Sequence, residues 1–247
     1  MKTKTVLISG GTSGVGKETV LKFLSDGFNV STFSENKLDV SELEKELNEK
    51  FDSEKFLVLK ADIREEEEVK KIVNETIDKF GVIDVLFNNA GIGYFDDCDK
   101  LDKKEFQKMV EVNLIGVAVL TNFVVPHMKK QKSGTIINMS SIWGKEGRIN
   151  RGFYSATKFG VMGYSESIRK ELKEFGIKVS TICPGMINTN FHDEEEVKRR
   201  EEEWGGEPAR KLQAEDVARI VTFISQESDW CDIQDLTVLP FPFDPKP

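Results

Sequence analysis

Short apolar runs alternate with longer amphipathic stretches along this chain. The runs, of which Val6-Leu7-Ile8 is the first, are mostly unbroken by polar residues, which predicts strands buried on both faces of a parallel sheet. The stretches between them have helical periodicity, so strand and helix alternate as a sheet covered by helices on both faces requires. We expect strands near residues 4–9, 28–33, 55–60, 83–88, 134–140, 177–183 and 235–239. We expect helices near residues 14–26, 40–50, 64–80, 102–131, 152–175, 189–203 and 214–226.

The length of the chain fits one domain of this kind. A chain of 247 residues can bury one full α/β core, and no repeat or linker divides it. We therefore expect a doubly wound parallel sheet, a Rossmann fold with three α/β/α layers, over residues 1–240, and a tail over residues 241–247. Ligands should bind at the carboxyl ends of the strands.

A glycine-rich turn follows the first apolar run. It carries Gly10, Gly14 and Gly16 and leads into an amphipathic stretch that extends to Phe28. Glycine lets the backbone approach a pyrophosphate closely, and the positive end of the following helix then faces the phosphates. An ordinary tight turn is the alternative, but the position after the first strand of an α/β chain favours a dinucleotide site.

A tyrosine and a lysine four residues apart are candidates for catalysis. On a helix, Tyr154 and Lys158 would share one face, and Ser141 lies thirteen residues upstream of the tyrosine. An ammonium beside a phenol lowers the pKa of the phenol from about 10 toward neutrality, so that it can donate or accept a proton. By itself the pair is weak evidence for catalysis, because a tyrosine and a lysine occur at this spacing by chance in many helices.

Several short motifs follow one another in a recognisable order. They are Gly10-x-x-x-Gly14-x-Gly16, Asp62 after the third strand, Asn88-Asn89-Ala90-Gly91 after the fourth, Asn113, the set of Ser141, Tyr154 and Lys158, and Pro184-Gly185 with Thr189. In this order the sequence resembles the short-chain dehydrogenase/reductase family, in its compact single-domain branch. The resemblance implies an oxidoreductase that transfers hydride between a nicotinamide cofactor and a carbonyl or secondary alcohol.

The resemblance assigns catalysis to Asn113, Ser141, Tyr154 and Lys158. Tyr154 would give or take the hydroxyl proton, and Ser141 would hydrogen-bond the substrate oxygen. Lys158 is implied to lower the pKa of the tyrosine and to hold the nicotinamide ribose. Asn113 is implied to position a water that links the lysine to solvent, although it could instead kink a buried helix. The adjacent Ser140 is expected to satisfy nearby backbone.

The resemblance also implies the cofactor-binding residues. They are Gly10, Thr12, Ser13, Gly14, Val15, Gly16, Ser34, Glu35, Asn36, Asp62, Ile63, Asn89, Ala90, Gly91, Tyr154, Lys158, Pro184, Gly185, Ile187 and Thr189. The end of the second strand should choose between NAD and NADP. Glu35 would repel a 2′-phosphate, whereas Ser34, Asn36 and Lys37 could bind one. We expect NAD or NADP, with a slight preference for NAD.

The substrate is less well defined. We expect its pocket to include Tyr94, Ile142, Trp143, Phe153 and Met186. The aromatic residues indicate either a partly apolar substrate or packing beneath a lid, and residues 187–208 have the length and charge of a mobile helical lid. The last strand lacks the glycine-rich ending usual in 3-oxoacyl-carrier-protein reductases. It is similar to the ending of a branch that includes hydroxy acid and hydroxy amino acid dehydrogenases.

Two other functions remain open. One is a 3-oxoacyl-carrier-protein reductase, for which Arg148, Arg151, Arg169 and Lys170 could form a basic docking face. The other is a catalytically silent sensor or scaffold that binds NAD(P). The complete set of catalytic residues disfavours that second alternative.

Charge and composition narrow the partners. A net charge of −8 argues against nucleic acid or an anionic membrane, and polar residues within 110–125 predict a buried helix rather than a membrane span. The two histidines and three cysteines lack metal or redox spacing, so we expect no metal site and reduced thiols. No apolar signal core precedes the first strand, which favours a cytoplasmic protein with a small-molecule substrate.

The resemblance further implies a homodimer or homotetramer. Its helices near 102–131 and 152–175 would pair with their counterparts across a two-fold axis. The apolar residues available for this contact would be Phe106, Met109, Val117, Leu120, Phe123, Phe159, Met162 and Ile168.

Overall fold

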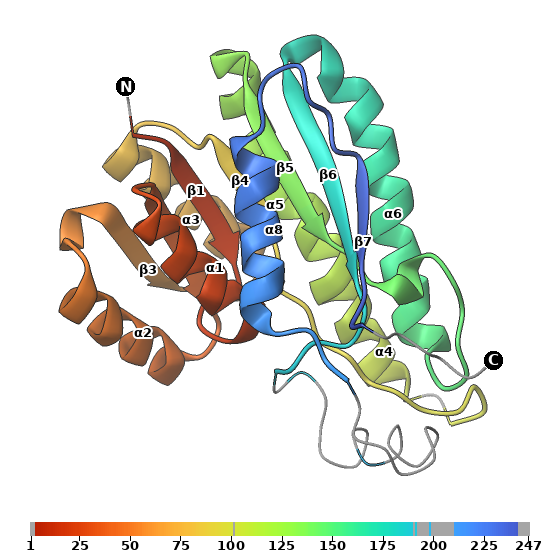
Figure 1. The fold of residues 1–247 in the computed structure, drawn as a ribbon. Coiled ribbons are helices and arrows are strands. Elements are labelled where there is room, and N and C mark those ends of the chain that lie inside the picture. The colour runs from red at the N-terminus through yellow and green to blue at the C-terminus, as the bar shows by residue number, and fades with distance from the viewer. Residues whose placement is uncertain (1–2, 101, 190, 192–197, 199–209, 242–247) are drawn as a thin grey trace.

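A parallel sheet forms the centre of the molecule (Figure 1). The computed structural model describes residues 3–100, 102–189, 191, 198 and 210–241. Within them the strands are β1 (Thr5–Ser9), β2 (Asn29–Ser34), β3 (Phe56–Lys60), β4 (Val85–Asn88), β5 (Gly134–Met139), β6 (Ile177–Pro184) and β7 (Asp235–Val238). Their order across the sheet is β3-β2-β1-β4-β5-β6-β7, and every adjacent pair is parallel. This is the expected doubly wound Rossmann arrangement.

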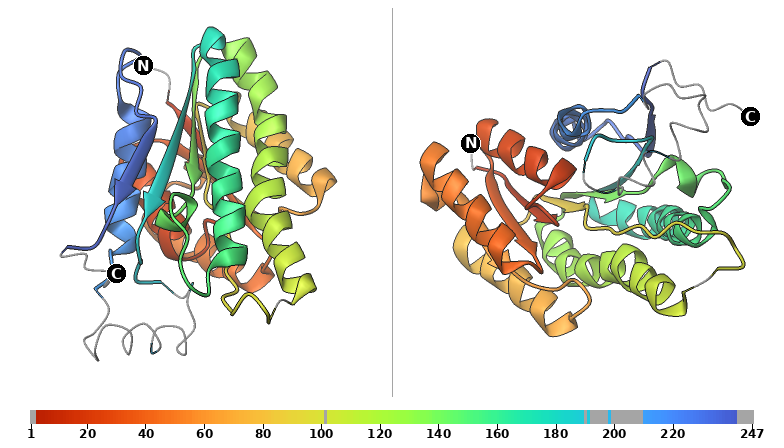
Figure 2. Two further views of the ribbon diagram at one scale, coloured as in Figure 1. Left: turned by 90° about the vertical axis from the view of Figure 1, so that its right-hand side faces the viewer. Right: turned by 90° about the horizontal axis from the view of Figure 1, so that it is seen from below.

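Helices cover both faces of the sheet, as the two further views show (Figure 2). One face carries α1 (Gly14–Ser25), α2 (Lys37–Lys50) and α8 (Ala214–Gln226). The other carries α3 (Glu66–Phe80), α5 (Gly116–Gln131) and α6 (Gly152–Leu172), with α4 (Lys103–Val110) leading into α5. Shorter helical segments are η1 (Ser53–Lys55), η2 (Glu111–Ile115), η3 (Ile142–Gly144) and η4 (Lys173–Phe175).

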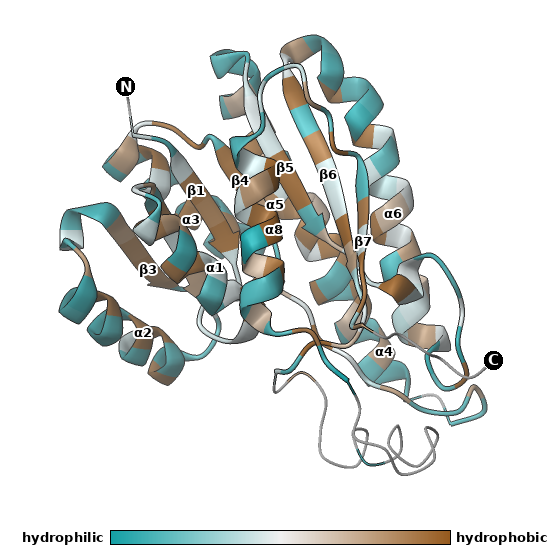
Figure 3. Cartoon of the chain, in the orientation of Figure 1, coloured by the Kyte–Doolittle hydropathy of each residue, from teal (hydrophilic) through white to brown (hydrophobic). Residues whose placement is uncertain are grey.

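The apolar runs of the sequence are the central strands, which are mostly brown in Figure 3. Successive side chains of a strand point to opposite faces of the sheet. Val6 and Ile8 therefore pack beneath α1 and α8, whereas Leu7 packs beneath α3 and α5. Since both faces are covered, an uninterrupted apolar run is favourable, and strict alternation is not required.

The chain changes direction across the sheet between β1 and β4. From β1 it winds outward through β2 to β3, and it then returns to the other side of β1 to form β4. The loops after β1 and β4 consequently leave the sheet toward opposite faces. Such a switch point opens a crevice at the carboxyl ends of the two strands, which is where open α/β sheets bind ligands.

The segment expected as one helix over 102–131 is helical throughout, but its winding changes in the middle. The turn η2 is π-helical and separates α4 from α5. By length and mean hydropathy (1.7 in its most apolar window) the 29 residues Lys103–Gln131 could cross a membrane, a test that buried core helices also pass. Leu120, Val124 and Met128 are fully buried in the core beneath the sheet, as a core helix requires.

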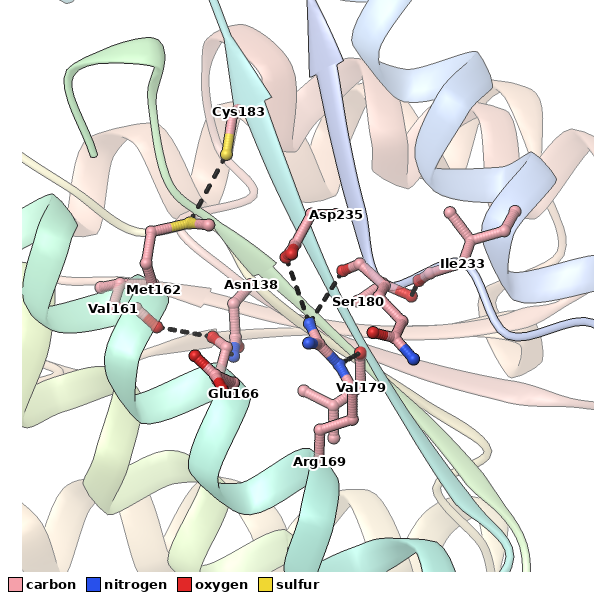
Figure 4. A network of polar contacts seen from close by, with 12 residues as sticks. Asn138, Val161, Met162, Glu166, Arg169, Val179, Ser180, Cys183, Ile233 and Asp235 are labelled. Atoms are coloured by element: carbon pink, nitrogen blue, oxygen red, sulfur yellow. Dashed lines mark hydrogen bonds and ion pairs between the residues drawn. The ribbon is translucent and has the colours of Figure 1, made fainter. Parts of the chain in front are cut away.

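A clamp of hydrogen bonds fastens β7 to the rest of the sheet (Figure 4). Arg169 of α6 donates to the carbonyl oxygens of Val179 (2.8 Å) and Gln234 (2.9 Å) and contacts the Asp235 carboxylate at 3.2 Å. The donors of Arg169 are thus engaged by partners within the subunit, and the Arg151 side chain is buried. The expectation that these two arginines belong to an exposed basic docking face is wrong.

Most expected elements agree with the structure within a few residues. The largest difference is α2, which begins at Lys37 rather than near residue 40 because the Asn36 side chain caps it by accepting the Leu38 N–H. The helix expected over 189–203, most of the lid expected over 187–208, and residues 242–247 of the tail lie outside the described residues.

The apolar residues assigned to a subunit contact divide into three groups, of which the partly buried one comprises Phe106, Phe123 and Met162. Met109, Val117, Leu120 and Ile168 are buried within the subunit, so their assignment as surplus apolar surface is wrong. Phe159 keeps 45% of its surface exposed on α6.

Candidate active site

A cavity of about 760 Å³ lies at the carboxyl ends of the central strands. Its walls come from the loops after β1, β4, β5 and β6, together with the N-terminal ends of α1 and α8. This is the switch point of the sheet. The volume is within the range of roughly 300–1,000 Å³ that small-molecule sites have.

The turn after β1 requires glycine for two different reasons. Gly10 and Gly14 have φ angles of 68° and 49°, which residues with a side chain rarely adopt. Gly16 has ordinary helical backbone, but a Cβ there would lie 2.1 Å from the Gly10 carbonyl oxygen. The first turn of α1 therefore comes up against the cavity, and its N–H groups have no acceptor within the helix. This glycine-rich turn, which we call the cradle (Gly10, Gly14 and Gly16), presents backbone without side chains at the N-terminus of a helix. Such a surface fits the pyrophosphate of a dinucleotide.

Ser9 and Asn89 hold this turn against the end of β4. The Ser9 hydroxyl accepts hydrogen bonds from the N–H groups of Asn89 (3.0 Å) and Ala90 (3.1 Å). The Asn89 amide in return donates to the carbonyl oxygens of Ser9 and Gly10, both at 3.1 Å. Ser9 was not among the expected site residues, because a serine at the end of an apolar strand has no distinctive sequence signal.

Lys158 lies one turn after Tyr154 on α6 and is only 3% exposed. Its ammonium donates to the Met139 carbonyl oxygen at 2.9 Å and lies 5.7 Å from the centre of the Tyr154 ring. Burial lowers the pKa of Lys158 to about 8, because desolvation disfavours the charged form. Both side chains line the cavity, so the pair expected from the sequence is in place.

The two serines at the end of β5 have different partners. Ser141 lines the cavity and caps η3, where its hydroxyl oxygen accepts the Trp143 N–H at 3.2 Å. Ser140 donates to the Lys158 carbonyl oxygen at 3.2 Å. The expectation that Ser140 satisfies nearby backbone is confirmed.

Asn113 occupies the π-helical turn η2 and is fully buried. Its amide donates to the Ile92 carbonyl oxygen and accepts the Ile92 N–H, both at 2.8 Å, and it also donates to the Thr157 hydroxyl at 3.2 Å. A Cβ built on Gly91 would lie 3.4 Å from the Asn113 oxygen and 3.6 Å from the Lys158 ammonium nitrogen. Asn113 thus ties the loop after β4 to α6, immediately beside the lysine.

Aromatic side chains surround Tyr154. Phe95 and Phe191 pack edge-on against its ring, at centroid distances of 5.4 and 5.9 Å. Of the expected substrate residues, Tyr94, Trp143 and Met186 line the cavity. Ile142 and Phe153 are not in its wall and pack against the apolar cluster of Met109, Trp143 and Tyr154.

Cofactor-binding candidates fall into two places. Thirteen line the cavity, namely Gly10, Ser13, Gly14, Val15, Asn89, Ala90, Gly91, Tyr154, Lys158, Pro184, Gly185, Ile187 and Thr189. Thr12, Gly16, Ser34, Glu35, Asn36, Asp62 and Ile63 are not in its wall. The side chain of Ile63 is buried in the core against Gly116, so only its backbone can face a ligand.

The ends of β2 and β3 hold a charged group that the sequence did not indicate. Arg64 lies between two carboxylates: its Nε is 2.9 and 3.0 Å from the two oxygens of Asp62, and its Nη2 contacts Asp62 and, at 3.5 Å, Glu35. The Arg64 guanidinium lowers the pKa of Asp62 below its usual value. Arg64 therefore lies beside the end of β2, outside the wall of the cavity.

Two further carboxylates, Glu18 of α1 and Glu215 of α8, line the cavity near the cradle and were not expected. Burial, and secondarily the charge of Glu215, raises the pKa of Glu18. The two residues come from helices far apart in the chain, so no sequence motif connects them.

The fold, the glycine-rich turn after β1 and the Tyr154–Lys158 pair together define a nucleotide-dependent oxidoreductase of the Rossmann class. The sequence model for the short chain dehydrogenase family matches residues 4–200, and the chain belongs to this family. It is accordingly an NAD(P)-dependent oxidoreductase that acts on carbonyl or alcohol groups.

Proteins with different names are similar to this chain. A 3-oxoacyl-(acyl-carrier-protein) reductase of Thermotoga maritima is 32% identical over 228 residues, which cover 92% of each chain. The crystal structure of levodione reductase is 29% identical, covers 95% of each chain and superposes with a TM-score of 0.87. The structure of ElxO with NADP bound is 31% identical, covers 97% of this chain and 98% of that one, and has a TM-score of 0.83.

Proposed function

We propose that this enzyme interconverts a carbonyl compound and a secondary alcohol at the floor of the cavity, with Tyr154 as the proton donor or acceptor. The bound nicotinamide supplies or accepts the hydride. The observation that carries the proposal is the buried Lys158 ammonium beside the Tyr154 ring, in a cavity that also has Ser141 in its wall. A cation so close favours the phenolate, because few water molecules screen it.

Ser141 and Asn113 are assigned supporting roles. The Ser141 oxygen accepts the Trp143 N–H, which fixes the hydroxyl and leaves its hydrogen to point at a substrate oxygen. Asn113 holds the Ile92 backbone next to Lys158, and we propose that this arrangement guides the proton that replaces the one lost by Tyr154.

For the cofactor we propose NAD in preference to NADP. Glu35 follows β2, nineteen residues after the last glycine of the cradle, where dinucleotide-binding folds place the acid that binds the adenosine ribose. Its carboxylate is 58% exposed, so it can turn toward a ribose hydroxyl. A 2′-phosphate there would meet a like charge.

For the substrate we propose a small, partly apolar carbonyl compound or the corresponding alcohol, hydroxy acids included. The aromatic and sulfur-containing wall of Tyr94, Trp143 and Met186 supports this class, as does the likeness to levodione reductase. A 3-oxoacyl-carrier-protein substrate is the second candidate, favoured by the Thermotoga relative. The ion pair of Arg169 with Asp235 of the same chain weighs against a carrier-protein substrate, because this arginine is then not available for docking.

We further propose a homodimer or homotetramer that works in the cytoplasm. Phe159 and Ile115 are large apolar side chains that remain 45% and 49% exposed on α6 and in η2, which supports a subunit contact there. Cys98, Cys183 and Cys231 are free thiols, which is the usual state in a reducing compartment.

Initial rates with NADH and NADPH against a panel of carbonyl compounds would test the activity. The panel should contain small cyclic and linear ketones, 2-oxo and 3-oxo acids, a 3-oxo ester and a 3-oxoacyl carrier protein. We expect turnover of small ketones or oxo acids at rates well above that of the Tyr154→Phe variant. Faster turnover of the carrier-bound substrate than of the small ester would favour the second candidate, and absence of turnover across the panel would contradict the proposal.

A further inference from the structure

We propose that Arg64 is a selectivity residue for the cofactor, and that its outer edge binds the 2′-phosphate of NADP, so that the enzyme accepts both dinucleotides. This inference rests on the proposed binding of a nicotinamide dinucleotide in the cavity. It adds a residue that opposes the preference set by Glu35.

The position of Arg64 follows from the pairing of β2 with β3. Ser34 and Lys60 are the last paired residues of the two strands, and the Ala61 N–H continues the pairing by donating to the Ser34 carbonyl oxygen at 3.0 Å. Glu35 and Asp62 therefore leave the sheet side by side. The Arg64 N–H closes a turn onto the Asp62 carboxylate at 2.9 Å, and this turn directs the guanidinium back toward Glu35.

Asp62 holds one edge of the guanidinium and leaves the other available. A guanidinium has five N–H donors in a planar fork. Asp62 engages the Nε donor and one Nη2 donor of Arg64. Among the described residues, Glu35 is the other partner of Nη2, and none accepts from Nη1. The edge formed by Nη1 and Nη2 thus faces away from Asp62, and this fork matches two oxygens of a phosphate.

The contact between Glu35 and Arg64 is weak enough to be displaced. The two groups are 3.5 Å apart, and Glu35 is the more exposed at 58%, against 31% for Arg64 and 19% for Asp62. Exposed ion pairs of this kind contribute little to stability. A phosphate, which carries nearly two negative charges, competes well with one mobile carboxylate, whereas the Asp62 contact keeps Arg64 in place.

The proposal implies a different arrangement of Glu35 and Arg64 with each cofactor. With NAD, Glu35 accepts the ribose 2′-hydroxyl and Arg64 stays between the two carboxylates. With NADP, Glu35 turns outward and the phosphate takes its place on the Nη1–Nη2 edge. Removal of Arg64 should then weaken NADP and spare NAD, and removal of the Glu35 charge should strengthen NADP.

Calorimetric titration of NAD and NADP against the full-length protein tests this without any substrate. We expect Arg64→Gln to raise the Kd of NADP by at least about tenfold, which corresponds to about 1.4 kcal/mol, and that of NAD by less than about threefold. Glu35→Gln should lower the Kd of NADP by about three- to tenfold. Lys170→Gln, which removes one positive charge from an exposed ion pair on α6, is the matched control and should change neither constant.

The double variant Glu35→Gln, Arg64→Gln separates a direct contact from a mere change in local charge, because its net charge at this place equals that of the wild type. We expect it to bind NADP at least tenfold more weakly than Glu35→Gln does. Recovery of the affinity of Glu35→Gln, equal loss of NAD and NADP in Arg64→Gln, or no NADP binding by the wild type at millimolar concentration would each overturn the inference. If the wild type binds neither dinucleotide, the proposed function itself fails.

Discussion

The burial of Lys158 should make the stability of the protein depend on pH in a measurable way. The folded state lowers the pKa of this lysine from 10.5 to about 8. Between those values the unfolded chain binds the extra proton and the folded chain does not, so the free energy of unfolding rises with pH. Most of the effect should develop between pH 7 and 10.

The size of the effect follows from the two pKa values. A difference of 2.5 units corresponds to about 3.4 kcal/mol of destabilisation when the lysine is fully protonated in both states. Between pH 7 and pH 9.5, linkage gives a gain of about 2 kcal/mol in the free energy of unfolding from this one group. Other groups also titrate in this interval, so the lysine must be isolated by comparison of variants.

Urea unfolding of Tyr154→Phe and of Tyr154→Phe, Lys158→Met provides that comparison, because the phenylalanine removes the titration of the tyrosine. Both proteins should be free of cofactor and at one protein concentration. The difference between their free energies of unfolding should shift by about 2 kcal/mol from pH 7 to pH 9.5, with the lysine-containing protein gaining stability. Loss of the hydrogen bond to Met139 adds an offset that does not depend on pH.

Lys170→Met in the same Tyr154→Phe background is the control, because Lys170 is exposed on the same helix. For that variant we expect a difference that is constant with pH. Parallel stability curves for Lys158→Met would refute the reasoning, because they would mean that the lysine keeps its ordinary pKa in the folded protein. The lysine could then lower the pKa of Tyr154 only by its charge, without the benefit of a dry site.

Four further predictions concern single residues. Tyr154→Phe should reduce turnover by about a hundredfold or more and change the Kd of the cofactor by less than about threefold, as steady-state rates and calorimetry would measure; near-normal turnover would contradict the proton role. Gly16→Ala should weaken dinucleotide binding at least tenfold, because its Cβ would lie 2.1 Å from a backbone oxygen, whereas Gly163→Ala, whose Cβ meets nothing within 4 Å, should raise the melting temperature slightly. Phe159→Lys should dissociate the assembly in sedimentation, and a wild type that is already monomeric at micromolar concentration would argue against the subunit contact. Glu35→Arg should shift the ratio of kcat/KM toward NADP by at least about tenfold, and an unchanged ratio would mean that Glu35 does not face the cofactor.

The sequence by itself was sufficient for the fold and for the main features of the site. Unbroken apolar runs separated by amphipathic stretches indicate a sheet covered on both faces. Each run and each stretch consists of consecutive residues, so the strands and helices can be predicted without knowledge of the tertiary structure. The glycine turn and the Tyr154–Lys158 pair are also local: one depends on the conformation of a few consecutive residues, the other on the pitch of one helix.

Only the tertiary structure decided which side chains meet across elements. Arg64 reaches Glu35 because β2 and β3 end at the same level of the sheet, and Arg169 holds β7 because α6 passes its edge. The side chain of Ile63, three positions before α3, points into the core and not into the site. Such contacts depend on strand register and on side-chain directions fixed by packing, so residues distant in the chain become neighbours without any motif to announce them.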